Sequence, residues 1–204
     1  MLGWPFGEGR HPLRLVWMGL VWLLLALTVV GIPIASLALT GWMLTAVDNL
    51  RAGRLELPPA GLYLRRGAPL FAVQLVYLLA LVLASGAPLA GGFRLGGIGG
   101  GLLAVFGESL FALGSTALVA VTPTLAVLTD AGGVGAGLNP ARLLEMLGRN
   151  RRLAVGSGLL SLLCLDIISP IGLLACGVGL AVSASYAYAV LASAIVAYDR
   201  QLRR

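Results

Sequence analysis

Apolar residues fill long uninterrupted runs of the chain, and polar residues gather in the short segments between those runs. A bilayer hydrocarbon core about 30 Å thick is crossed by roughly 20 apolar residues in a helix. The pattern therefore predicts an all-α integral membrane protein that forms a single multi-pass domain. The six predicted transmembrane helices lie at residues 13–31, 34–50, 68–87, 102–129, 153–169 and 172–198.

The breaks between these runs contain residues that are typical of turns. Gly31-Ile32-Pro33 favours a tight turn, because proline removes a backbone hydrogen bond from a helix that continues through it. The alternative is one kinked helix over residues 13–50, which would reach well beyond the bilayer. Pro170 and Gly172 predict another turn. Residues 86–101 contain eight glycines and predict a flexible outer loop or a loosely packed helix start.

Two polar segments predict cytoplasmic elbows that each carry a short interfacial helix. In residues 51–66, Gly53 can end one helix and Pro59 can begin the elbow helix. The second elbow follows a glycine-rich connection at residues 130–138. There, Asn139-Pro140 forms a cap and first-turn pair for an amphipathic helix.

Composition agrees with a membrane protein and excludes a water-soluble globule, since 59% of residues are hydrophobic and 11% are charged. The net charge is +6, and all fourteen basic residues are arginine. Thirteen of them fall on one predicted side and only Arg94 on the other, which predicts cytoplasmic termini. Nucleic-acid binding is not expected, because the arginine clusters lack interleaved aromatic residues. The arginines expected to meet anionic lipid headgroups are Arg51, Arg54, Arg65, Arg66, Arg149, Arg151 and Arg152.

A weak internal repeat relates the two elbows. When the sequence is shifted by 81 residues, Leu57–Gly67 aligns with Leu138–Gly148 at five of eleven positions. One interpretation is a parallel repeat about the membrane normal. The other is that any two cytoplasmic elbows look alike, since each needs a cap, a proline and arginines.

The segment from Gly41 to Leu83 contains the motifs of a family resemblance. Its motifs are the pair Gly41-Trp42, the basic helix end Arg51 to Gly53, the step Leu57-Pro58, and Gly67. With the last helix, YAYAVLASAIVAYDRQ, the chain resembles the prokaryotic family catalogued as domain of unknown function 4013. Trp42 stands where a tyrosine is usual, and Pro59 where an acidic or aromatic residue is common. The resemblance covers most of the chain, implies a multi-pass inner-membrane protein and supplies no activity.

Few ionisable groups fall inside the predicted helices, and these are the first candidates for a polar or ion site. Glu108 and Asp166 both map near the outer ends of their helices. They are expected either to reach interfacial water and Arg94, or to bind an ion or proton. Gln74 is the fourth candidate, and a hydrogen bond between helices is its expected use.

Small residues at four-residue spacing predict a packing ridge on the last helix. The ridge consists of Ala175, Gly179, Ser183 and Ala187, and it can meet a helix of the same chain or a partner. Cys164 and Cys176 are expected to be small buried residues, with a facultative disulfide as the alternative.

The sequence contains no nucleophile–base pair, metal-ligand cluster or phosphate-binding loop, so we expect neither an enzyme nor a bound cofactor or metal. The glycines of residues 91–101 lack the preceding strand and following lysine of a phosphate site. We expect an accessory or scaffold subunit that packs with membrane proteins, with copies of itself or with lipids, in a bacterial or archaeal cytoplasmic membrane. The alternative is a small transporter or permease-like subunit with a polar cavity between the hairpins, containing Gln74 or Asp166.

Overall fold

The computed structural model describes residues 5, 11–28, 31–149, 151–169 and 178–202, and within these ranges it is helical and free of strands. The helices, in chain order, are α1 (His11–Ala26), α2 (Gly31–Arg51), α3 (Leu64–Leu95), α4 (Gly97–Gly137), α5 (Pro140–Arg149), α6 (Arg151–Leu162), the π-helical segment η2 (Leu163–Ile168) and α8 (Val178–Leu202). The all-helical class is confirmed.

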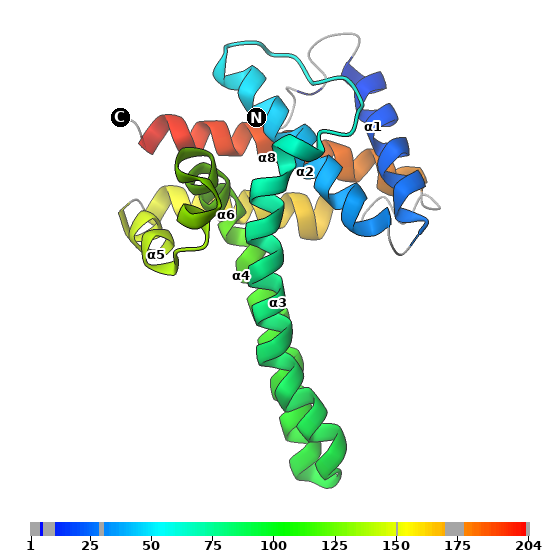
Figure 1. Cartoon of the computed structure of the whole chain (residues 1–204), viewed down its shortest axis with the longest axis vertical. Helices are drawn as coiled ribbons and strands as arrows, with labels where there is room; N and C mark the ends of the chain where they lie inside the picture. The colour runs from blue at the N-terminus through cyan, green and yellow to red at the C-terminus, as the bar shows by residue number, and fades with distance from the viewer. Residues whose placement is uncertain (1–4, 6–10, 29–30, 150, 170–177, 203–204) are drawn as a thin grey trace.

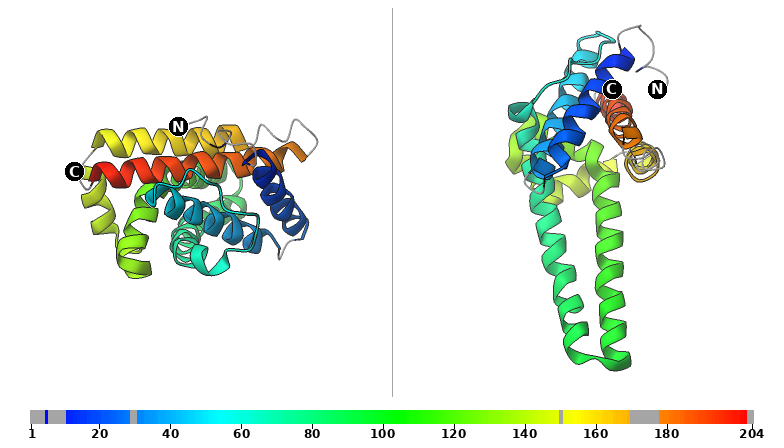
Figure 2. Two further views of the ribbon diagram at one scale, coloured as in Figure 1. Left: turned by 90° about the horizontal axis from the view of Figure 1, so that it is seen from above. Right: turned by 90° about the vertical axis from the view of Figure 1, so that its right-hand side faces the viewer.

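The helices form two parts (Figure 1). Helix α3 and most of α4 lie side by side in a long hairpin. The hairpin projects from a platform made of α1, α2, α5, α6, η2 and α8 (Figure 2). Helices α2 and α8 run across the axis of the hairpin and not beside it. The sequence predicts membrane crossings at residues 34–50 and 172–198, and its hydropathy pattern carries no information about the angle between helices.

Small residues allow the two helices of the hairpin to touch. A Cβ atom added at Gly92 would lie 2.6 Å from the carbonyl oxygen of Gly100, so the two backbones are in contact there. The turn lies at Gly96 and Gly97, which both have a φ of 61°, in the left-handed region that favours glycine. Residues 86–101 are therefore helix ends around a tight turn, and the flexible-loop alternative is wrong.

The expected glycine-rich connection at residues 130–138 is also helical. Helix α4 continues to Gly137 and bends at Gly133, whose φ of 70° breaks the helical geometry. Helix α5 follows with the expected cap, because the Asn139 side-chain oxygen accepts the N–H groups of Ala141 at 3.0 Å and Arg142 at 3.2 Å. A helix thus follows Asn139 as predicted, and its place in a cytoplasmic elbow remains a prediction.

The first elbow contains no helix, and this expectation was wrong. Residues 52–63 are irregular, and α3 begins at Leu64 and not near Pro59. The aligned segments Leu57–Gly67 and Leu138–Gly148 therefore differ in structure. The elbow carbonyls bond to side chains of α1 and α2 in place of a helical ladder: Pro58 accepts from Trp42 Nε1 at 3.1 Å, Glu56 from Asn49 Nδ2 at 3.0 Å, and Leu57 from Arg14.

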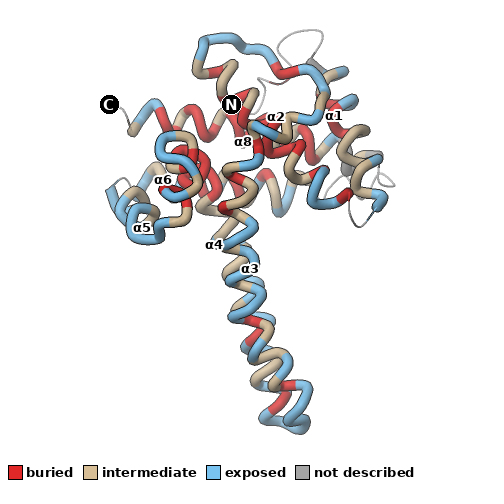
Figure 3. The backbone as a smooth tube through the Cα atoms, viewed as in Figure 1, coloured by how far each residue is buried: buried red, intermediate tan, exposed pale blue. Residues whose placement is uncertain are grey.

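The hydrophobic core lies in the platform, where α2 and α8 contribute most of the buried side chains (Figure 3). The part of the hairpin beyond the platform is largely exposed and apolar. Four described helices are long and apolar enough to cross a membrane, namely Gly31–Arg51, Leu64–Leu95, Gly97–Gly137 and Val182–Leu202. The count of six crossings remains a prediction. The predicted helix at 153–169 is α6 followed by η2, and part of the one at 172–198 falls outside the described residues.

The described part of the α8 ridge packs within the same chain. Ala187 is fully buried against Cys164 of η2, and the Ser183 hydroxyl donates to the Ser169 carbonyl at 2.6 Å. Gly179 is half-buried. Ala175 and Cys176 lie outside the described residues, so the disulfide alternative remains a prediction.

Candidate functional site

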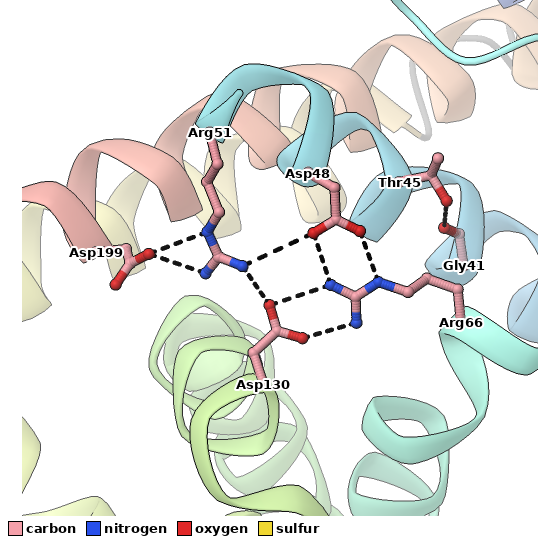
Figure 4. A network of polar contacts seen from close by, with 7 residues as sticks. All are labelled: Gly41, Thr45, Asp48, Arg51, Arg66, Asp130 and Asp199. Atoms are coloured by element: carbon pink, nitrogen blue, oxygen red, sulfur yellow. Dashed lines mark hydrogen bonds and ion pairs between the residues drawn. The ribbon is translucent and has the colours of Figure 1, made fainter. Parts of the chain in front are cut away.

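Five charged side chains meet at the base of the hairpin (Figure 4). We call them the ionic cluster: Asp48 and Arg51 from α2, Arg66 from α3, Asp130 from α4 and Asp199 from α8. They include three of the chain's four aspartates. The cluster joins both helices of the hairpin to two helices of the platform.

Arg66 holds two of the aspartates. Its Nε and Nη2 atoms donate to the two carboxylate oxygens of Asp48 at 2.8 and 2.9 Å, which is the bidentate geometry that guanidinium favours. Its Nη1 atom donates to Oδ1 of Asp130 at 2.7 Å. One side chain of α3 thus connects α2 to α4.

Arg51 extends these contacts to α8. Its Nη1 atom lies 2.5 Å from Oδ2 of Asp130, and its Nη2 atom lies 2.9 Å from Oδ2 of Asp199. Arg200, the next residue on α8, donates from Nη2 to the Leu50 carbonyl at 2.9 Å. Asp130 therefore binds both arginines, and Asp48 also lies within ion-pair distance of both, since its Oδ1 atom is 3.8 Å from Arg51 Nη1.

The cluster is partly buried and carries a formal charge of −1, from two guanidinium and three carboxylate groups. The side chains of Asp199 and Asp130 are 8% and 15% exposed. Beside them is a cleft of about 480 Å³, lined by Arg51, Arg66, Asp130, Asp199, Val127 and Ala131. Both guanidinium groups form ion pairs with carboxylates of the same chain. The arrangement therefore fits a structural role, in which the cluster holds the helices together, better than an anion-binding site.

A close approach of α2 and α3 positions Arg66. A Cβ atom added at Gly67 would lie 2.5 Å from the Leu37 carbonyl oxygen and 2.7 Å from the Gly41 backbone nitrogen. Gly41 in turn lies against the carbonyl oxygen of Tyr63. Gly41 and Gly67, two of the family motif positions, thus lie in contact. This close approach of α2 and α3 brings Arg66 within hydrogen-bond distance of Asp48.

Tyr63 also lies at this contact between α2 and α3, with its carbonyl oxygen against Gly41. Its hydroxyl donates to the Pro59 carbonyl at 2.9 Å. Burial raises the pKa of the Tyr63 hydroxyl, and the positive charge of Arg14 partly offsets that rise. The hydroxyl therefore stays protonated and can keep donating at neutral pH.

The structure does not bring the four predicted polar-site residues together. Glu108 and Arg94 are exposed on the hairpin, and no ion pair joins them in the part of the chain described. Asp166 is exposed on η2. Gln74 makes the expected bond between helices, because its Nε2 atom donates to Thr122 Oγ1 at 3.4 Å.

The hairpin sets the distance between Glu108 and the ionic cluster. Its neighbour Gly107 faces the carbonyl of Ser85, with 2.8 Å between that oxygen and an added Cβ atom. Ser85 lies about 30 Å along α3 from Leu64, at 1.5 Å per residue. This separation is close to the thickness of a hydrocarbon core, about 30 Å, and the membrane depth of Glu108 remains a prediction.

The arginines expected at lipid headgroups separate into two groups. Arg51 and Arg66 bind aspartates, a role that the sequence did not indicate. The others are exposed: Arg54, which donates to Asn49 Oδ1 at 3.1 Å, and Arg65, Arg149, Arg151 and Arg152.

The sequence interpretation missed Asp48, Asp130 and Asp199, although a signal was present. Each aspartate lies at or near the cytoplasmic end of a predicted helix, level with the arginine clusters. Charged ends of neighbouring helices at one depth are expected to pair. Among the described residues, no group of three His, Cys, Asp or Glu side chains could hold a metal ion.

Comparison with known proteins gives one match. The sequence model of a family described as "Protein of unknown function (DUF4013)" matches residues 24–182. This range contains the Gly41–Gly67 junction and all of the ionic cluster except Asp199. No curated protein and no solved structure matches the chain.

Proposed function

Because the chain belongs to the DUF4013 family, whose function is unknown, we propose a function from the structure: a non-enzymatic accessory or scaffold subunit of a prokaryotic cytoplasmic membrane. The hairpin crosses the bilayer and packs against a partner membrane protein. The platform lies at the cytoplasmic face. The observation that carries the proposal is the unpartnered apolar surface of the hairpin.

The sides of the hairpin support its contact with lipid. Large apolar side chains there are 40–75% exposed, a surface that water would disfavour and hydrocarbon would accept: Leu75, Leu79, Leu83, Val105 and Leu113. Helix α3 has 32 residues and is about 48 Å long, which exceeds the hydrocarbon core of about 30 Å. A hairpin that starts at the cytoplasmic boundary therefore reaches the outer headgroups.

The tip of the hairpin supports a protein partner. The exposed fractions of Phe93, Leu95, Ile98 and Leu102 are 81%, 73%, 86% and 69%. At headgroup depth these side chains are outside the hydrocarbon, and a cluster of large exposed apolar residues is typical of an interaction site. A neighbouring membrane protein would cover them.

The distribution of charge supports the proposed orientation. The described arginines lie at the platform and the base of the hairpin, except Arg94, which lies near the tip. Cytoplasmic segments carry the excess of arginine in membrane proteins. With the platform on the cytoplasmic side, insertion of the hairpin moves only Arg94, among the described arginines, across the bilayer.

The transporter alternative has less support. It would need a water-lined path that contains Gln74 or Asp166. Gln74 instead bonds to Thr122 between the packed helices α3 and α4, and Asp166 is exposed on the platform. Tight packing of the hairpin favours the scaffold proposal.

Purification of the tagged protein from its host in a gentle detergent tests the proposal. We expect a membrane protein to co-purify in a fixed ratio, and we expect the double variant Phe93→Ser, Ile98→Ser to reduce its recovery about tenfold. The matched control is Leu55→Ser, an exposed leucine on the elbow. Recovery of the wild-type chain alone, or equal partner loss in the control, would contradict the accessory role.

A further inference from the structure

Helices α4, α5 and α6 enclose a groove at the base of the hairpin. Its volume is about 400 Å³, within the range of roughly 300–1,000 Å³ that small-molecule sites occupy. The walls are apolar and include Val121, Leu144, Leu147 and Val155. Arg151 also lines it, so the groove combines an apolar interior with one positive charge.

The groove lies where membrane lipid would reach it. Helices α5 and α6 are on the side of the platform from which the hairpin projects (Figure 1). The groove also adjoins an apolar stripe along α6 and η2, in which exposed residues recur every four positions: Val155, Leu159, Leu163 and Ile167. This stripe gives an acyl chain a continuous apolar route into the groove.

The charge around the groove is uncompensated. Arg151 and its neighbours Arg149 and Arg152 are exposed, and none of them forms an ion pair with a described residue. They differ in this from Arg51 and Arg66, whose charges are met by aspartates. The uncompensated positive charge beside an apolar groove is complementary to an anionic headgroup on an acyl chain.

We infer that this groove binds an anionic phospholipid, with the phosphate group at Arg151 and an acyl chain against Leu144 and Val155. The inference rests on the proposed membrane placement and adds a specific lipid site to it. Zwitterionic lipid would bind more weakly, because its headgroup has no net charge to pair with the arginines. A free phosphate ion would leave the apolar walls uncovered.

Gly148 offers a direct test, because it lines the groove and a Cβ atom added there meets no atom within 4 Å. Gly148→Leu should fill the groove without disturbing the fold. Gly101→Leu is the matched control, since Gly101 also has open space around it but lies near the hairpin tip. Arg151→Gln and its control Arg65→Gln test the charge in the same way.

The experiment titrates the delipidated full-length protein in detergent with phosphatidylglycerol or phosphatidylcholine, and counts bound lipids by native mass spectrometry. We expect tighter binding of phosphatidylglycerol. Arg151→Gln should weaken it about fivefold, since one arginine near an anionic surface contributes about 1 kcal/mol. Gly148→Leu should weaken both lipids, and both control variants should match wild type.

The inference would be overturned by equal binding of the two lipids by wild type, by unchanged binding in Gly148→Leu, or by equal loss in Arg65→Gln and Arg151→Gln. Displacement of the lipid by inorganic phosphate would also overturn it, because the acyl chain would then contribute nothing. A chain that purifies without a protein partner but keeps this lipid preference would contradict the accessory role and leave the lipid site intact.

Discussion

Asp130→Asn is expected to lower the free energy of unfolding by about 3 kcal/mol, the lower end of what loss of one partner costs in a buried ion pair. Asp130 forms the short contacts with both Arg51 and Arg66, at 2.5 and 2.7 Å. The asparagine side chain has the same shape, but it is neutral, and only its one oxygen can accept hydrogen bonds. Two partly buried guanidinium groups would each lose one of their carboxylate partners, and Arg51 would keep Asp199 while Arg66 would keep Asp48.

Thermal unfolding in a mild detergent would measure this change. Asp166→Asn is the matched control, because Asp166 is exposed and outside the ionic cluster. We expect the control to unfold at the wild-type temperature. If Asp130→Asn also unfolded there, the cluster would not fasten the hairpin to the platform.

Gly67→Ala should destabilise the protein by about 3 kcal/mol, near the upper end of the usual cost of overpacking. The new methyl group would lie 2.5 Å from the Leu37 carbonyl oxygen and 2.7 Å from the Gly41 nitrogen. Both are backbone atoms of α2, so no side chain can rotate away. Helices α2 and α3 would have to separate, which would also displace Arg66 from Asp48.

The control for this substitution is Gly86→Ala in the same helix, where an added Cβ atom meets nothing within 4 Å. There we expect a small gain in stability, since alanine favours helix over glycine by about 1 kcal/mol. Comparison of the two variants by thermal unfolding separates crowding at the junction from helix propensity. Equal stability of the two would contradict the close contact between α2 and α3.

The sequence predicted those features that depend on neighbouring residues. The cap by Asn139 was found because a capping side chain bonds to the backbone two and three residues later. The first elbow was mispredicted as a helix because its carbonyls bond to distant side chains, such as that of Trp42, sixteen residues earlier. Local helix propensity depends on neighbouring residues, so it does not reflect hydrogen bonds to side chains that are distant in the sequence.

The ionic cluster shows the same limit more strongly. Arg51 pairs with residues 79 and 148 positions away, so its partners depend on how α4 and α8 pack against α2. The positions of these charges and of Glu108 along the predicted helices give an expected depth in the membrane, which remains a prediction. The depth of a residue in the membrane can be predicted from hydropathy along the chain. The side chains that it contacts at that depth depend on the angles at which the helices pack.

The central claim is that the hairpin crosses the bilayer while α1 and α2 stay at the cytoplasmic face. It can be tested by labelling single cysteines in intact cells with a membrane-impermeant maleimide, after replacement of both native cysteines. Ile98→Cys probes the hairpin tip and Ile32→Cys probes the start of α2. Both isoleucines are exposed, by 86% and 51%. We expect residue 98 to be labelled from outside, and residue 32 to be labelled only after the cells are permeabilised. Labelling of residue 32 in intact cells would contradict this claim and favour six crossings.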